Sequence, residues 1–271
     1  MSNTKAVEIS SSNTLLNCRI FGDGAKSAIC FHGFGQDGTA FLPVLDAQPN
    51  YRLYSFDLPF HGKSTIRNFN LFLTAEEICS LVEQLLNEYR IGKFSILAFS
   101  IGAKFVFPIA ERFASKIDYI GLLAPDGLQM NILYKIATIN AFSRTMFRFA
   151  MKNPVFVKSG LKLLRFVHLV DPETSNLVEK STSSLRQGER VYYSWVYLRK
   201  LKPDIKLLAD LANKNGFDLE IVAGKNDKII SEMKLAKAIK GLRNVRLISL
   251  QARHDNVIRK YADFKGNSSN V

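Results

Sequence analysis

Short apolar runs alternate with helical segments along most of this 271-residue chain. Turn residues close most of these runs, and between the runs apolar side chains recur at helical spacing. The strands we expect cover residues 6–10, 15–21, 28–31, 51–56, 94–99, 119–124, 219–223 and 245–250. This alternation predicts an α/β fold, with a mostly parallel central sheet flanked by helices. Open sheets of this kind place their sites beyond the carboxyl ends of the strands.

The helices between these strands have recognisable starts and ends. Thr74 and Glu77 have the spacing of a capping box before a helix that Gly92 would end. Another helix is expected over residues 103–113, directly after the strand 94–99. Later helices should run to about residue 213, over 231–240 and beyond Asn256, and the tail 266–271 is expected to be disordered.

The alternation stops between residues 127 and 202, where helical periodicity continues without a convincing strand. The simplest account is a sheet domain interrupted by a helical insertion. We therefore expect a core made of residues 1–126 and 203–271, and a helical cap insertion made of residues 127–202.

One serine lies where an expected strand turns into an expected helix, in Ala98-Phe99-Ser100-Ile101-Gly102. A tight turn there lifts the hydroxyl clear of the sheet and crowds the positions two before and two after it. Ala98 and Gly102 are small enough for such a turn. The helix that follows directs its first N–H groups at the site, where they would stabilise developing negative charge.

Composition limits the class of protein. Hydrophobic residues make up 47% and charged residues 23%, which is usual for a globular protein. The three cysteines lie in apolar segments without Cys-x-x-Cys spacing, so we expect buried free thiols and no zinc or redox pair. The sequence has no signal peptide pattern and no apolar run long enough to span a membrane. A soluble cytoplasmic protein of unknown oligomeric state is the default expectation.

Five segments, in order, resemble motifs of the α/β-hydrolase superfamily. The serine turn resembles its G-x-S-x-G nucleophile elbow, with Ala98 in place of the first glycine. Residues 31–35 resemble its oxyanion loop, and residues 57–64 its D-x-P-G-x-G-x-S loop, with Phe60 where glycine is usual. Residues 223–227 and 253–255 follow the late strands where the family carries its acid and its histidine. The resemblance covers about residues 15–126 and 203–260.

The resemblance implies a role for each site residue. Ser100 would be the nucleophile, His254 its general base, and Asp227 the acid that orients the histidine. The chain order Ser…Asp…His is the one expected for this fold. The backbone N–H groups of Phe34 and Ile101 would form the oxyanion hole.

Each assignment has an alternative. Ser100 and Asp227 could be ordinary turn residues and His254 a surface histidine, and Asp126, which also follows a strand, is the rival acid. Among the other titratable groups, Asp255 could cap the last helix. Of the remaining histidines, His32 and His61 are expected to order their loops. His168 is expected to be structural or to lie near the substrate.

The triad implies hydrolysis of an ester-type bond through an acyl-enzyme, without metal or cofactor. A carboxylic ester is the leading substrate class. A thioester or a carbon–carbon bond next to a carbonyl would use the same triad, and these alternatives stay open. A non-catalytic binding protein on the same scaffold is the rival from another class.

The formal net charge of +13 is concentrated in the insertion, where thirteen Lys and Arg stand against four Asp and Glu. No basic run, zinc-finger spacing or aromatic RNA-binding motif indicates nucleic acid. Three interpretations stay open: solvated faces of amphipathic helices, steering of an anionic ester or thioester, and peripheral contact with an anionic membrane.

Overall fold

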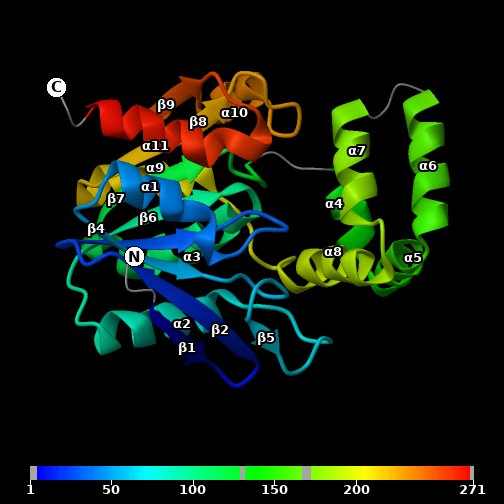
Figure 1. Cartoon of the computed structure of the whole chain (residues 1–271), viewed down its shortest axis with the longest axis horizontal. Helices are drawn as coiled ribbons and strands as arrows, with labels where there is room; N and C mark the ends of the chain where they lie inside the picture. Colours follow the sequence, from blue (N-terminus) through cyan, green and yellow to red (C-terminus); the bar gives the residue numbers. More distant parts are fainter. Residues whose placement is uncertain (1–4, 129–131, 167–171, 269–271) are drawn as a thin grey trace. The chain divides into compact units, whose positions relative to one another are not determined.

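The computed structural model describes residues 5–128, 132–166 and 172–268, and within them a nine-stranded, mostly parallel sheet (Figure 1). Its order is β1-β2-β4-β3-β6-β7-β8-β9, and β5 pairs with β2. Strands β3 to β9 on the main path run parallel, and β2 is antiparallel to its neighbours β1 and β4. The α/β architecture expected from the alternation is confirmed.

The strand bounds follow the apolar runs closely. They are β1 Lys5–Ser10, β2 Thr14–Phe21, β3 Lys26–Phe31, β4 Tyr51–Phe56, β5 Thr65–Ile66, β6 Phe94–Phe99, β7 Ile117–Leu123, β8 Asp218–Gly224 and β9 Val245–Leu250. Every residue of β6 is buried, as a central parallel strand covered on both faces requires. The three free cysteines, Cys18, Cys30 and Cys79, are all buried.

Helices cover the sheet in two groups. Helix α1 (Leu42–Ala47) packs against α11 (Val257–Ser268), and the two lie together in front of the sheet in Figure 1. In the other group, α2 (Ala75–Glu88) packs on α3 (Ala103–Phe113), α3 on α9 (Ile205–Asn215), and α9 on α10 (Glu232–Ile239). Short 3₁₀ turns complete this part; they are η1 Gly38–Phe41, η2 Ser100–Gly102, η3 Ala114–Lys116 and η4 His254–Asn256.

Two helix ends differ from expectation. Thr74 caps α2 by accepting the Glu77 N–H at 3.1 Å, but the helix ends before Gly92: Arg90 takes the left-handed conformation, with φ +52°. Its turn is closed by the Ile91 N–H, which donates to the Leu86 carbonyl at 2.8 Å. The last helix, α11, continues through Gly266 to Ser268, where we expected a disordered tail.

The chain divides into two compact units. A core unit comprises residues 1–68, 73–129 and 201–271, and a helical unit comprises residues 69–72 and 130–200. The helical unit contains α4 Ile132–Thr138, α5 Ala141–Lys152, α6 Pro154–Phe166, α7 Pro172–Ser181 and α8 Leu185–Tyr197. Helix α8 lies so close to α5 that a Cβ at Gly188 would be 1.9 Å from the Met151 carbonyl oxygen. Among the described residues, no helix has both the length and the apolar character to cross a membrane.

Candidate active site

Ser100 stands on a strained turn at the carboxyl end of β6. Its φ is +51°, a left-handed conformation that non-glycine residues rarely adopt, and η2 leads directly from it into α3. A Cβ at Gly102 would lie 2.3 Å from the Phe31 carbonyl oxygen, so only glycine fits there. Ala98 is fully buried. Residues 98 and 102 therefore have to be small for steric reasons, as the sequence indicated.

The hydroxyl of Ser100 belongs to a hydrogen-bonded chain of three side chains. His254 Nδ1 is 2.7 Å from Asp227 Oδ2, and His254 Nε2 is 3.1 Å from Ser100 Oγ. Because a carboxylate only accepts, Nδ1 carries the ring proton and Nε2 is left to accept from the serine hydroxyl. The Phe99 ring, 4.9 Å from the imidazole, supports one side of it.

Asp227 is held in place by its own loop. Its side chain is buried, and Oδ1 accepts the backbone N–H groups of Ile229 and Ile230, each at 2.8 Å. These bonds occupy one carboxylate oxygen and turn the other toward His254. The carboxylate is therefore already oriented by the backbone.

The loops after β8 and β9 are joined to each other by backbone hydrogen bonds. The Lys225 N–H donates to the Leu250 carbonyl at 2.9 Å, and the Asn226 N–H to the Ala252 carbonyl at 3.0 Å. A Cβ at Gly224 would lie 2.6 Å from the Ala252 oxygen, so this close approach requires glycine. The aspartate and the histidine, 27 positions apart in sequence, are thus brought together by the main chain as well as by their side chains.

Asp126, the rival acid, lies in a different environment. Its backbone N–H donates to the Ser100 carbonyl at 3.0 Å, which joins the end of β7 to the serine turn. Burial lowers the pKa of Lys104, and the negative charge of Asp126 opposes that shift, so the Asp126 carboxylate acts on Lys104. The acceptor at His254 Nδ1 is Asp227.

The expected oxyanion donors lie on two backbone segments, the serine turn after β6 and the loop after β3, a strand that pairs with β6. Ile101 is the first residue after Ser100, and its N–H belongs to the first turn of a helix, where no intrahelical acceptor exists. Phe34 lies in the loop after β3, where the Gly33 N–H donates to Gln36 Oε1 at 2.9 Å. The half-buried Phe34 ring packs edge-on against His61, with ring centroids 5.2 Å apart.

Two buried histidines order the loops after β3 and β4, as we expected. His32 Nε2 accepts the Leu58 N–H at 2.9 Å, and its Nδ1 donates to the Gly33 carbonyl at 2.7 Å. His61 Nδ1 donates to the Pro59 carbonyl at 2.9 Å. The two imidazoles are 5.3 Å apart and meet edge to face. His168 lies outside the described residues. Asp255 lies within η4, just before α11, and pairs with exposed Arg253 at 2.9 Å.

The neutral state of His32 makes folding sensitive to acid. Burial lowers its pKa from 6.5 to about 4, so between these values the unfolded chain binds a proton that the folded chain does not. The free energy of unfolding should therefore fall as the pH drops through this window, by about 3 kcal/mol in full. Denaturant unfolding of His32→Gln, which keeps an acceptor for Leu58, should show a smaller loss between neutral pH and about pH 4.5 than the wild type. Equal losses in the two proteins would contradict this assignment.

Sequence reasoning missed the carboxylate that organises the loop after β4. Asp57 is fully buried, and burial alone would raise its pKa. Hydrogen bonds hold the pKa below its usual range instead; the donors are the Lys63 N–H, Arg19, the Gly38 N–H and Asn17. A Cβ at Gly62 would lie 2.1 Å from Asp57 Oδ2, so the loop can wrap the carboxylate only with glycine there. The signal in the sequence that could have identified Asp57 was its place as the first residue of the D-x-P motif.

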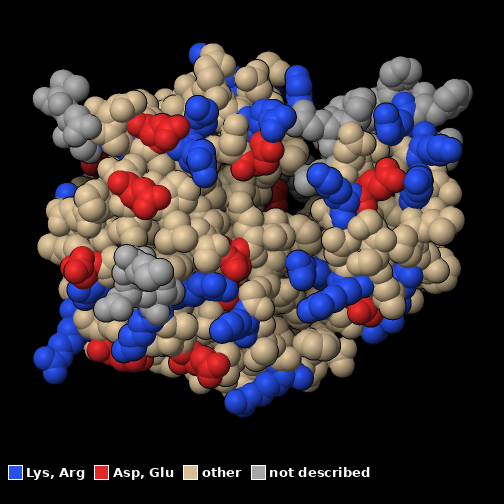
Figure 2. Space-filling view, viewed as in Figure 1, with Lys and Arg blue, Asp and Glu red and all other residues tan. Residues whose placement is uncertain are grey.

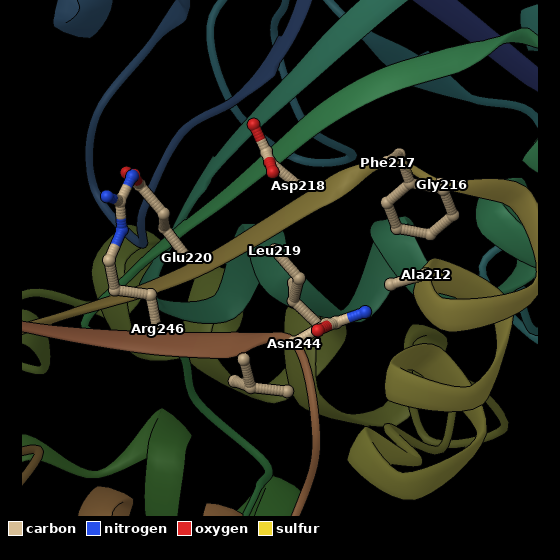
Figure 3. Close-up of a pocket in the computed structure, with 9 residues that line it drawn as sticks. Ala212, Gly216, Phe217, Asp218, Leu219, Glu220, Asn244 and Arg246 are labelled. Atoms are coloured by element: carbon tan, nitrogen blue, oxygen red, sulfur yellow. The ribbon is translucent and has the colours of Figure 1, made fainter.

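A separate hollow of about 490 Å³ lies at the amino ends of β8 and β9 (Figure 3). In the close-up the Glu220 and Arg246 side chains lie side by side, and they form an ion pair. Glu220 also binds Lys265 at 2.8 Å and the Tyr119 hydroxyl at 2.6 Å. Its carboxylate is thus saturated by groups of the protein. The triad lies beyond the carboxyl ends of the strands, so this hollow is not part of the candidate active site.

A serine, a histidine and an aspartate joined in this order, beyond the carboxyl ends of a mostly parallel sheet, are typical of serine-dependent α/β-hydrolases. Residues 29–169 match the model of a family described as alpha/beta hydrolase fold. Because this match spans more than half of the chain, the chain belongs to that family. Within the described residues, no cluster of His, Cys, Asp and Glu has the composition of a metal site.

Curated relatives match a limited stretch. Over 106 residues the chain is 26% identical to the probable lysophospholipase BODYGUARD 1 of Arabidopsis thaliana, which covers 37% of the chain and 23% of that protein. Over 110 residues it is 28% identical to protein PHYLLO, chloroplastic, of the same organism, covering 36% of the chain and 6% of that protein. The chain thus spans less than a quarter of the length of these relatives.

Solved structures match the whole chain. A thermophilic esterase from Thermogutta terrifontis superposes with a TM-score of 0.70 at 15% identity, over 98% of this chain and 97% of that one. The thioesterase domain from a curacin biosynthetic pathway superposes with a TM-score of 0.65 at 15% identity, over 97% and 98%. At such identities the likeness shows the fold alone.

Proposed function

We propose that the protein hydrolyses a carboxylic ester through an acyl-enzyme formed on Ser100, with His254 as base and Asp227 as the orienting acid. The observation that supports this most strongly is the unbroken chain from Asp227 through His254 to Ser100, with distances of 2.7 and 3.1 Å. A structural serine or a surface histidine has no reason to complete such a chain.

In this mechanism Ser100 Oγ attacks the ester carbonyl carbon while its proton passes to His254 Nε2. The carbonyl oxygen becomes an oxyanion, which the N–H groups of Phe34 and Ile101 stabilise. His254 returns the proton to the departing alcohol, and the carbon–oxygen bond to that alcohol breaks. Water, deprotonated by His254, then attacks the acyl-enzyme, which releases the acid and restores the serine hydroxyl. Asp227 stabilises the imidazolium in both halves of the cycle.

The triad alone does not select the leaving group, so a thioester or a carbon–carbon bond next to a carbonyl stays an alternative substrate. Both an esterase and a thioesterase domain are among the structural neighbours, so the shared fold is compatible with either leaving group and does not choose between them. We also propose that the insertion of residues 127–202 is the cap domain of the enzyme. The rival proposal, a binding protein without turnover, predicts no rate with any of these substrates.

A substrate series tests the proposal. p-Nitrophenyl esters of graded acyl length and matched acyl-thioesters should be hydrolysed, with the esters giving the higher kcat/KM. The activity should resist metal chelators, since no step uses a metal. If the thioesters gave the higher kcat/KM, the substrate class would be a thioester and not a carboxylic ester. No turnover of either series by a folded preparation would favour the binding protein.

A further inference from the structure

Large apolar side chains that face solvent are concentrated on the helical unit. Of the thirteen such side chains among the described residues, ten lie within residues 69–72 and 130–200. Scattered exposed apolar residues are normal on a soluble protein, whereas a contiguous group marks an interaction surface. Seven of the ten lie between α4 and the start of α6; they are Ile136, Ile139, Phe142, Met146, Phe149, Val155 and Phe156.

The exposed side chains of α5 and α6 form one patch. Phe142, Met146 and Phe149 follow at i, i+4 and i+7 and so share one face of α5, opposite buried Met151. The Phe149 ring contacts Phe156 at the start of α6, with centroids 5.9 Å apart, so the two helices present a continuous surface. The most exposed members are Phe142 at 75% and Val155 at 79%. We refer to this apolar patch by its members: Phe142, Met146, Phe149, Val155 and Phe156.

The segment that carries the apolar patch has cations and no anions. Residues 127–170 contain seven Lys and Arg and no Asp or Glu. On α6 the exposed Lys158, Lys162 and Arg165 follow at i, i+4 and i+7 and so share one face. Lys158 is paired with Glu179 of α7, but within the described residues Lys162 and Arg165 have no ion-pair partner. Figure 2 shows Lys and Arg side chains, with Asp and Glu among them, on the face of the helical unit that is in view.

We propose that the helical unit docks on the surface of an anionic phospholipid bilayer. The apolar patch would enter the boundary between headgroups and acyl chains, and Lys162 and Arg165 would lie among the phosphates. Helices with aromatic side chains on one face and Lys and Arg on another are typical of segments that lie in a membrane interface. The negative potential of an anionic leaflet attracts such cations.

Phe and Met side chains would suit a protein interface as well, but two features favour a bilayer as the partner. The cores of protein interfaces are depleted in lysine and need a complementary surface of matching shape. Acyl chains adapt to protruding side chains such as Phe142 and Val155 without a preformed match. The proposal also stands apart from the hydrolytic one, because it uses no residue of the triad: Ser100→Ala should bind vesicles as the wild type does.

Vesicle co-sedimentation of the full chain tests the docking. The protein should bind phosphatidylcholine vesicles that contain about 30% phosphatidylserine, and bind pure phosphatidylcholine vesicles weakly. Raising the salt from about 0.1 to about 0.5 M should weaken binding to the anionic vesicles, because exposed charges are then screened. Equal binding to the two kinds of vesicle, or none to either, would overturn the proposal.

Variants separate the apolar patch from general stickiness. Phe142→Ser with Val155→Ser should weaken binding to anionic vesicles by about tenfold or more, because these two side chains would be buried in the bilayer. The matched control is Met233→Ser on α10 of the core unit, where an equally exposed apolar side chain, at 77%, is removed and binding should not change. Equal effects of the double variant and of Met233→Ser would contradict docking through this surface.

A fluorescence measurement tests the geometry without weakening the patch. Phe142→Trp should be quenched by vesicles whose acyl chains carry bromine, beyond the background of the native Trp195, while Met233→Trp should not. If Phe142→Trp is unquenched, the patch does not enter the bilayer and the lipid proposal fails. If Phe142→Ser with Val155→Ser leaves vesicle binding unchanged but abolishes self-association or capture of a protein partner, the surface serves a protein and the lipid proposal fails too.

Discussion

Ser100→Ala should lower kcat/KM for an ester substrate by about 10⁴-fold or more. The variant has no nucleophile for the acyl-enzyme, although the imidazole and the backbone donors stay in place. Its stability should change little, because one hydroxyl is lost at a half-buried turn and alanine has no larger side chain to fit at φ +51°. Steady-state rates and denaturant unfolding on the same preparation would measure both effects.

Ser95→Ala is a matched control for this loss. Ser95 is buried on the same strand, β6, so the substitution removes a hydroxyl from the same element without touching the triad. Its activity should stay near that of the wild type. If Ser100→Ala keeps more than a few per cent of the rate, or Ser95→Ala loses as much, then Ser100 is not the nucleophile.

Asp227→Asn should lower the rate nearly as much as Ser100→Ala does, with a loss on the order of 10⁴-fold in kcat. Asparagine can still accept the N–H groups of Ile229 and Ile230, so the loop should keep its shape. Its amide, however, would donate to His254 Nδ1 and hold the proton on Nε2, the nitrogen that has to accept from Ser100. The turnover number at saturating ester is the quantity to measure.

Asp126→Asn makes the comparison specific. Asp126 is also an aspartate beyond a strand end, but its carboxylate acts on Lys104, and only its backbone N–H contacts the serine turn. The substitution keeps that N–H and should change turnover far less. A larger loss with Asp126→Asn than with Asp227→Asn would move the acid to the end of β7.

The sequence predicted the elements around the serine well. The expected bounds of 51–56, 94–99, 103–113 and 245–250 are those of β4, β6, α3 and β9. The three strands are short runs bounded by turn residues, and the helix carries apolar side chains at helical spacing, so local information sets their limits. The three side chains that meet at Ser100 were predictable as neighbours, because each follows the carboxyl end of a parallel strand. Their catalytic roles stay predictions.

What the sequence did not predict depends on contacts between distant segments. The six residues of α1 and the two of β5 are too short for periodicity to identify. The partners of Asp57 come from β2, from the start of η1 and from its own loop, and no local pattern indicates that they meet. Residues 69–72 belong to the helical unit through Phe69, whose ring lies 5.0 Å from Tyr193, and Phe72, 4.9 Å beneath the Arg199 guanidinium.

A fluorophosphonate probe followed by peptide mapping tests the central claim most directly, because it needs no knowledge of the substrate. The probe reacts with a serine only when a base has activated the hydroxyl. The account predicts one adduct, on the peptide that contains Ser100, which is retained in Asp126→Asn and strongly reduced in His254→Ala. No adduct on the folded wild-type protein, or an adduct on another serine with Ser100 unmodified, would contradict it.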